Sequence, residues 1–289
     1  MLLIVGALVV IGSVIGGFLI EGGHMLVLSQ PAEFLIIGGA AIGSLIIGTS
    51  LSIVKKLVSQ ILALFKAPKG KAQYSDLLAM LFQLFKLSQQ GGIMALEAHV
   101  ESPEKSPVFS KFPGFLAHHE ALDFLSDSLK VMIVGGISPH DLDTLLEIDL
   151  EVRHHHASLP AATLGKVGDS LPGLGIVAAV LGVVNTMGAI DGPPSEIGEK
   201  VGAALVGTFL GILMCYGFVQ PLASRLEQYI ADEGNYEQCI RAGLVALYKG
   251  LPPVIAVEFA RRVLPEEVRP TFEETEKICK PGKPEAVAA

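Results

Sequence analysis

Long uncharged runs alternate with polar segments along this chain. Four runs hold no Asp, Glu, Lys, Arg or His, and they cover residues 1–20, 34–54, 171–190 and 201–224. Each has 20 residues or more, so as a helix each extends about 30 Å, the thickness of the hydrocarbon core of a bilayer. Because backbone amides in lipid must pair within their own segment, the pattern predicts four transmembrane helices.

The run 1–20 has a second interpretation as a cleaved signal peptide. It lacks the basic start of such peptides, and no A-x-A-like cleavage site precedes Glu21. We therefore expect it to be the first membrane span.

Basic residues are distributed unevenly among the segments between these runs. The connection 21–33 holds no Lys or Arg and the connection 191–200 holds one, whereas the other 20 of the 21 lie in 55–166 or after residue 224. The positive-inside rule places these two basic segments, and both termini, in the cytoplasm. The breaker Asp191-Gly192-Pro193-Pro194-Ser195 makes the third and fourth spans an antiparallel hairpin.

The polar segments have helical periodicity. Helices are predicted over 74–90 and 115–134, and a further helix runs from the capping box at Ser138 and Asp141 to about His156. The segment 97–114 contains three prolines and is predicted to form short turns or a loop. Strand patterns of useful length are missing from the sequence.

Together these patterns predict an all-α membrane protein. Four parts follow one another: transmembrane helices one and two in 1–54, a large helical cytoplasmic insert in 55–168, transmembrane helices three and four in 169–224, and a C-terminal cytoplasmic helix and tail in 225–289.

Composition excludes several classes of protein. Hydrophobic residues make up 51% and charged residues 17%, against about 25% charged in a typical soluble domain. The net charge of −8 argues against a nucleic-acid partner, which needs clustered Lys and Arg. The three cysteines, Cys215, Cys239 and Cys279, form no CxxC pair and are expected to be reduced thiols.

Recognisable catalytic or metal-binding motifs are missing from the sequence. It has no GxSxG, GxxxxGK[ST] or HExxH pattern, so we expect neither an enzyme nor a cofactor. The run His154-His155-His156 points in different directions on a helix and is interpreted as a solvated helix end, as is His118-His119.

Pairs of glycines four residues apart recur in the uncharged runs. Such small-xxx-small pairs let helices approach closely in lipid. They could serve packing within one four-helix bundle or between subunits, and their spread over several helix faces favours an oligomer. The pairs are Gly12 and Gly16, Gly39 and Gly43, and Gly207 and Gly211.

The interiors of the four runs contain no ionisable side chain. The most polar candidates there are Thr208, Asn185 and Thr186, and a hydroxyl cannot hold a proton at neutral pH. Thr208 could instead bond back to a carbonyl of its own helix. An ion path through these helices would therefore need a carboxylate from another chain.

Two prolines mark the predicted cytoplasmic mouths of the last two spans. Pro172 lies at the start of the third run, where an early-turn proline is also a sufficient explanation. Pro221 lies inside a continuing helical pattern, where it removes the bond to the Gly217 carbonyl and predicts a kink.

Several strings in these runs are specific to one family. Asp169-Ser170-Leu171-Pro172 with the following 175–180 and the string 206–213 with Pro221-Leu222-Ala223 resemble the third and fourth spans of the MotA/PomA family of flagellar stator subunits, which is related to ExbB and TolQ. Gln30-Pro31-Ala32-Glu33 and Ala256-Val257-Glu258-Phe259 also match. The resemblance extends from Met1 to about Phe272.

The resemblance implies a motor subunit in the bacterial inner membrane. Members of the family form a pentameric ring around two copies of MotB, a single-span protein anchored to peptidoglycan that supplies the membrane aspartate. Proton flow then generates torque on FliG of the rotor. The resemblance thereby accounts for the missing carboxylate.

The resemblance also assigns roles to single residues. Pro172 and Pro221 match the prolines that couple ion flow to torque, and Thr208 matches a threonine that faces the partner's aspartate. Ala179 replaces the Thr of sodium-driven relatives, so protons are favoured over sodium. Glu97 matches an acidic rotor contact.

The basic counterpart of that rotor contact falls at Gln89, which is a departure from the family pattern. Lys86, one helical turn earlier, could replace it, and Glu97 could alternatively be a solvated charge.

Three other functions compete with a motor subunit, and each requires a feature of its own. An ExbB/TolQ-type energiser of an outer-membrane system usually has three spans, a secondary transporter needs broken helices or midplane charges, and a membrane enzyme needs a catalytic constellation.

Overall fold

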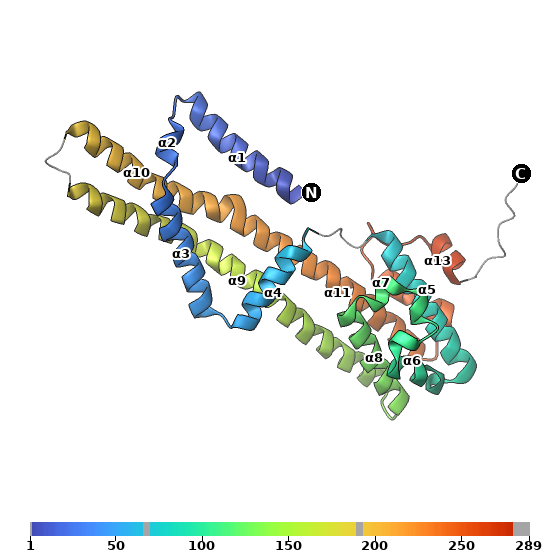
Figure 1. Ribbon diagram of the computed structural model, residues 1–289. Coiled ribbons are helices and arrows are strands. Elements are labelled where there is room, and N and C mark those ends of the chain that lie inside the picture. Colours follow the sequence, from blue (N-terminus) through green and yellow to red (C-terminus); the bar gives the residue numbers. More distant parts are fainter. Residues whose placement is uncertain (1, 66–69, 189–192, 280–289) are drawn as a thin grey trace, which may run out of the picture. The chain divides into compact units, whose positions relative to one another are not determined.

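The computed structural model describes residues 2–65, 70–188 and 193–279, without the side chains of 195 and 196. Every regular element in these ranges is helical (Figure 1). The α-helices are α1 (Leu2–Ile20), α2 (Met25–Leu28), α3 (Pro31–Gly48), α4 (Leu51–Ala63), α5 (Lys71–Gly91), α6 (Glu97–Glu101), α7 (Pro113–Leu116), α8 (His119–Val134), α9 (Pro139–Met187), α10 (Pro194–Ile212), α11 (Gln220–Tyr248), α12 (Pro253–Arg262) and α13 (Phe272–Cys279). Three 3-10 turns, η1 (Ile93–Leu96), η2 (Pro103–Lys105) and η3 (Phe109–Lys111), and a π-helical segment, η4 (Leu213–Val219), complete the set.

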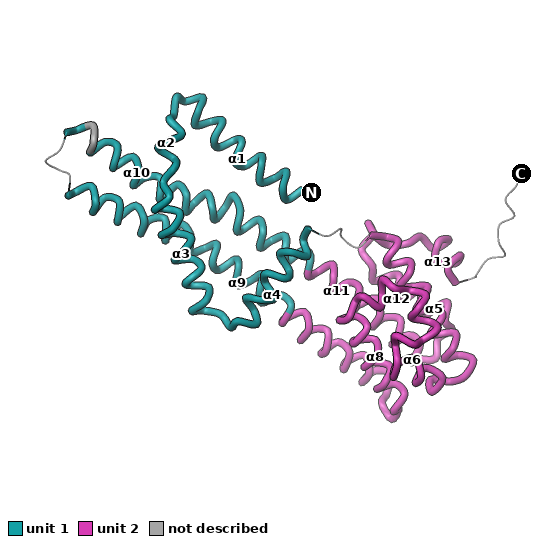
Figure 2. The backbone as a smooth tube through the Cα atoms, viewed as in Figure 1, with its two compact units in different colours: residues 1–67, 157–229 teal, residues 68–156, 230–289 magenta. Residues whose placement is uncertain are grey.

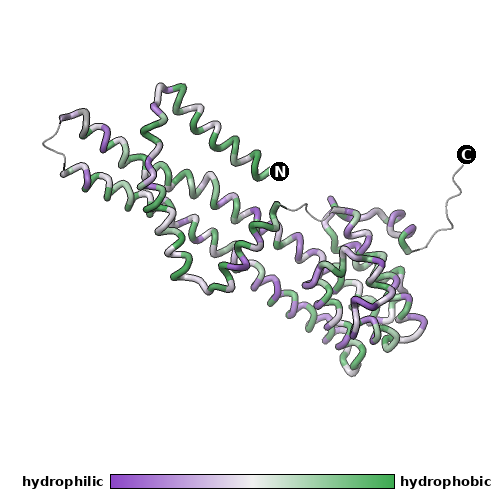
Figure 3. The backbone as a smooth tube through the Cα atoms, viewed as in Figure 1, coloured by the Kyte–Doolittle hydropathy of each residue, from purple (hydrophilic) through white to green (hydrophobic). Residues whose placement is uncertain are grey.

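The chain forms two compact units (Figure 2). The first, here called the membrane unit, comprises residues 1–67 and 157–229, and the second, the polar unit, comprises 68–156 and 230–289. Hydrophobic residues dominate long stretches of the helices in the membrane unit (Figure 3). The helices α9 and α11 contribute residues to both units.

Four helical stretches are long and apolar enough to cross a membrane, which confirms the predicted number of spans. They are Leu2–Ile20, Met25–Gly48, Pro139–Met187 and Ile197–Tyr248. The breaker residues Asp191 and Gly192 lie outside the described residues.

The second span ends earlier than the uncharged run suggests. Helix α3 stops at Gly48 because Thr49 is extended, with φ −145° and ψ 143°, and a new helix, α4, begins at Leu51. Thr and Ser favour such breaks because they are poor helix formers with local hydrogen-bonding alternatives. Hydropathy alone could not detect this break, since residues 49–54 carry no charge.

Helix α9 is longer than predicted. It runs unbroken for 49 residues through Pro160 and Pro172, whereas the sequence suggested an end near His156. Its start is as predicted: the Ser138 hydroxyl donates to Asp141 Oδ2 at 2.6 Å, and the Asp141 amide donates to Ser138 Oγ at 3.1 Å. The same helix therefore carries polar residues at one end and a membrane span at the other.

The polar unit has one hydrophobic core. Apolar side chains recur at helical spacing on α5, as on Leu77, Leu81 and Leu84, and all three are fully buried. Complete burial of such a side chain stabilises the fold by about 1.5–3 kcal/mol. The segment 97–114 holds only short helices and 3-10 turns, as its prolines predict, whereas the helix predicted over 115–134 begins at His119.

His118 is not the solvated residue that its sequence suggested. Its Nε2 lies 2.6 Å from Glu233 Oε2, and its ring stacks on Tyr236 with 5.3 Å between the ring centroids. Its Nδ1 accepts a hydrogen bond from the Ala121 amide at the start of α8. The interpretation of His118 as a solvated helix end is therefore wrong. The local sequence could not show this, because Glu233 and Tyr236 lie more than 100 residues away from His118 in sequence.

Candidate functional site

Helices α9 and α10 meet through glycines in the membrane unit. A Cβ atom added to Gly211 would lie 2.5 Å from the Leu171 carbonyl oxygen, and one added to Gly175 would lie 2.8 Å from the Gly207 carbonyl oxygen. Real Cβ atoms do not approach other atoms so closely, so only glycine fits at this crossing. The structure therefore places Gly207 and Gly211 where two helix backbones touch.

The other two glycine pairs make no close contact with the described part of this chain. Added Cβ atoms on Gly12, Gly16, Gly39 and Gly43 would meet no atom within 4 Å. Packing between α9 and α10 thus uses one of the three pairs, and the remaining two leave open surface on α1 and α3.

Glu33 reaches the same crossing from the first turn of α3. A Cβ atom on Gly207 would lie 2.5 Å from Glu33 Oε2, and one on Gly182 would lie 3.7 Å from Glu33 Oε1. The side chain is only 7% exposed, and Oε2 has no hydrogen-bond partner among the described residues. Among those residues no other Asp, Glu, Lys, Arg or His is buried to this degree.

The interiors of the four uncharged runs contain no Asp, Glu, Lys, Arg or His, but the burial of Glu33 just outside them was not predicted. Glu33 immediately precedes the uncharged run 34–54 and is the last residue of the connection 21–33. The structure includes it in the span Met25–Gly48. The local sequence does not show the burial of Glu33, because this burial depends on contacts with Gly182 and Gly207 that only the folded chain brings together.

Ala179 and Thr208 both lie at the α9–α10 crossing. The Ala179 amide nitrogen would be 3.1 Å from a Cβ on Gly207, and the Thr208 Cα 3.3 Å from a Cβ on Gly175. The Thr208 hydroxyl forms no hydrogen bond to a described residue, whereas Thr186 bonds back to the Gly182 carbonyl at 2.8 Å. Asn185 is exposed.

The two prolines lie where α9 and α11 run past each other. Gln220, which precedes Pro221, donates hydrogen bonds to Asp169 Oδ1 at 2.6 Å and to the Gly165 carbonyl at 3.2 Å. Pro172 follows Asp169 by three positions on α9. These bonds tie the start of α11 to the part of α9 that carries Pro172.

Pro221 is accommodated by a change of helix type. The seven residues Leu213–Val219 form the π-helical segment η4 before α11 begins at Gln220. A π-helical turn shifts the hydrogen-bonding register, which suits a proline that cannot donate to the residue four positions earlier. Such segments often lie at functional sites.

The predicted rotor-contact residues all lie on the surface of the polar unit. Lys86 and Gln89 are on α5, and Glu97 is the first residue of α6. All three side chains are exposed, and none forms an ion pair or side-chain hydrogen bond with another described residue.

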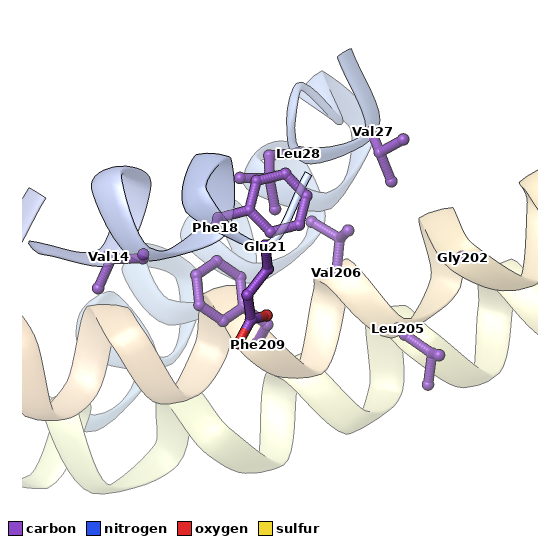
Figure 4. A pocket seen from close by; sticks show the side chains of 10 residues that line it. Val14, Phe18, Glu21, Val27, Leu28, Gly202, Leu205, Val206 and Phe209 are labelled. Atoms are coloured by element: carbon purple, nitrogen blue, oxygen red, sulfur yellow. The ribbon is translucent and has the colours of Figure 1, made fainter. Parts of the chain in front are cut away.

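A pocket lies between α1, α2 and α10 on another side of the membrane unit (Figure 4). Its lining is apolar apart from Glu21, whose carboxyl group points toward Phe209. Val206 and Phe209 line this pocket and flank Gly207 and Thr208 in sequence.

Two family models match this chain. Residues 4–92 match the Motility protein A N-terminal family, and residues 117–237 match the MotA/TolQ/ExbB proton channel family. The first covers α1 to α5, and the second covers α8, α9, α10 and most of α11.

Named relatives match over nearly the whole chain. Motility protein A of Salmonella typhimurium and that of Escherichia coli are each 43% identical over 278 residues, which cover 96% of this chain and 94% of theirs. Chemotaxis protein LafT of Vibrio parahaemolyticus is 39% identical and covers 94% of this chain and 96% of its own.

Solved structures share the fold. A chain of C. jejuni MotAB superposes with a TM-score of 0.75 at 20% identity, covering 93% of this chain and 98% of that one. The flagellar MotAB stator complex of Bacillus subtilis gives a TM-score of 0.70 at 23% identity, covering 88% and 92%. By full-length sequence identity and by fold, the chain belongs to the Motility protein A family.

Proposed function

We propose that this chain is a stator subunit of the bacterial flagellar motor, which forms with MotB a proton-conducting complex that converts the proton motive force into torque. The observation that supports this most directly is the α9–α10 crossing, where glycine contacts bring the helix segments of Thr208 and Ala179 together and a buried acid reaches Gly207. The 43% identity to Motility protein A over nearly the full chain agrees with it.

The partner follows from the chemistry of the spans. Sustained proton transport needs a carboxylate that can load and unload at depth, and α9 and α10 offer only a hydroxyl there. A single-span MotB would bring its aspartate to Thr208. The complex is then a ring of five copies of this chain around two copies of MotB.

The spans and the distribution of basic residues support one orientation, which is part of the proposal. The membrane is the bacterial inner membrane, both termini are cytoplasmic, and the polar unit lies in the cytoplasm. There, Glu97 with Lys86 or Gln89 would contact FliG of the rotor, since these exposed side chains lack partners among the described residues.

Protons are the proposed ion because of Ala179. A dehydrated sodium ion needs several oxygen ligands, and the methyl group of Ala179 provides none beside Thr208. The chain itself then needs no bound cofactor.

An ExbB/TolQ-type energiser of an outer-membrane system is the alternative. The match over 117–237 covers that class as well. The separate match over 4–92 to the Motility protein A N-terminal family and the four spans favour the flagellar motor.

Complementation tests this function. Cells that lack their own Motility protein A but contain a flagellar motor should swim when this chain is expressed with its MotB, and they should still swim in sodium-free medium. A chain that inserts into the membrane with MotB yet restores no swimming would contradict the stator function, and a sodium requirement would contradict the choice of ion.

A further inference from the structure

Glu33 has one buried carboxyl oxygen without a hydrogen-bond partner among the described residues. Gly182 and Gly207 leave space for its carboxyl group, and the other atoms nearest to added Cβ atoms at these two positions belong to Ala178, Ala179 and Ala204. None of these side chains carries a donor or a charge. Oε2 is buried without a hydrogen bond from any described residue.

On α9 and α10, the charged residues nearest to Ala179 and Gly207 lie about two to three helical turns away along the helix axis. On α10 the closest ionisable residue, Lys200, lies seven positions before Gly207, which is about 10 Å at 1.5 Å per residue. On α9 the closest is Asp169, ten positions before Ala179 and so about 15 Å away. Helix α3 carries no other ionisable residue, and Glu21, at the end of α1, lines the pocket on the side of Val206 and Phe209.

An ionised carboxylate is expensive in such surroundings. A charge buried in a low-dielectric environment without a counter-charge or donors costs several kcal/mol or more, and an acid inside a membrane span is by default a functional candidate. The neutral acid is the form that fits the space between Gly182 and Gly207, here called the glycine notch.

We propose that Glu33 is a second protonatable carboxyl group of the ion path, which takes up a proton from water on the outer side and passes it to the carboxylate of the partner chain beside Thr208. This inference rests on the proposed stator function. In the transfer the O–H bond of Glu33 breaks, a new O–H bond forms on the partner's carboxylate, and Glu33 is reprotonated by hydronium from the outer side.

The position of Glu33 suits this role. It lies in the first turn of α3, at the end of the connection 21–33 that is assigned to the outer side. Its carboxyl group contacts Gly207, the residue before Thr208. It therefore lies between the outer solution and the place where the partner's carboxylate is expected.

The test uses the complete complex with its partner, reconstituted in vesicles, and measures proton flux with a pH-sensitive dye. Glu33→Gln keeps the shape of the side chain and removes the exchangeable proton. We expect flux to fall about tenfold or more, since a positioned proton-transfer group contributes at least that factor. Glu21→Gln, a nearby acid outside the notch, is the matched control and should conduct like the wild type.

A second readout does not depend on the partner or on motor function. Infrared difference spectra of the purified subunit should show the C=O band of a protonated carboxylic acid at neutral pH, and this band should be missing in Glu33→Gln and shifted in Gly207→Ala. Wild-type flux in a stable Glu33→Gln complex, or the absence of that band from the wild-type spectrum, would overturn the role of Glu33 while leaving the stator function intact.

Discussion

Gly211 lies against Gly175 where α9 crosses α10: a Cβ atom added to Gly211 would be 2.9 Å from the Gly175 Cα. The two helices that carry Thr208 and Ala179 are thus in backbone contact, which fixes the spacing of the whole site. Lipid supplies no hydrophobic drive for this association, so close packing must supply it.

Gly175→Ala should therefore separate α9 from α10. The added methyl would approach the Gly207 carbonyl oxygen to 2.8 Å, and overpacking of this kind costs about 1–3 kcal/mol. We expect a lower thermal unfolding midpoint of the purified chain in detergent. Gly173→Ala, two residues away on the same helix and facing open space, should unfold like the wild type, and equal midpoints for the two variants would contradict the crossing.

Pro172→Ala should uncouple ion flow from torque generation. Pro172 lies three residues after Asp169, which accepts the hydrogen bond from Gln220 at the start of α11. Relief of the proline constraint allows α9 to regain a regular hydrogen bond there. We expect normal membrane insertion and normal co-purification with MotB, together with loss of swimming in a soft-agar assay. A motile Pro172→Ala strain would remove the proline from the coupling step.

Charge reversal at Glu97 should weaken torque without blocking the ion path. Glu97 is exposed on α6 in the polar unit, whereas Thr208 and Glu33 belong to the membrane unit. In Glu97→Lys we expect slower rotation of tethered cells and unchanged proton flux in vesicles. Glu101→Lys, one turn further on the same short helix, is the control, and wild-type rotation in Glu97→Lys would exclude this rotor contact.

Glu258 should make the polar unit sensitive to acid. Hydrogen bonds from Arg261, reinforced by Arg262 and opposed by burial, lower the pKa of Glu258 from 4.5 to about 2. The folded-state pKa is below the unfolded one, so this contribution to stability is fully present above about pH 4.5 and is lost as the pH falls toward 2.

Glu258→Gln should remove that contribution. We expect the variant to lose about 1–3 kcal/mol at neutral pH, the value of hydrogen bonds to a charged group. Its unfolding free energy, followed by circular dichroism of the full chain, should also depend less on pH between 4.5 and 2. Glu267→Gln, an exposed acid that follows α12, should retain the wild-type pH profile; identical profiles for all three proteins would refute this role of the ion pairs.

The sequence allowed the number of spans to be predicted because a membrane imposes a length and a polarity on each helix. It also located the capping box at Ser138 and the short turns of 97–114, whose signals lie within a few residues of one another. The break at Thr49 was missed because it lies inside an uncharged run, and the continuity of α9 was missed because packing overrides the local signals near His156.

The site was only partly predictable for a related reason. Thr208 was identified because it is one of the few polar residues in the uncharged runs, which the composition of its own segment shows directly. The burial of Glu33 depends on Gly182 and Gly207, residues 149 and 174 positions away in sequence, and the partnership of His118 with Glu233 spans 115 positions. Contacts at such separations leave no local pattern to recognise.

Proton flux with and without the partner chain is the most direct measurement of the central claim, which is that this subunit conducts only when MotB supplies its aspartate. Vesicles containing the purified subunit alone should remain tight to protons under an imposed pH gradient, and vesicles containing the subunit with MotB should discharge that gradient. Rapid discharge by the subunit alone would contradict the account.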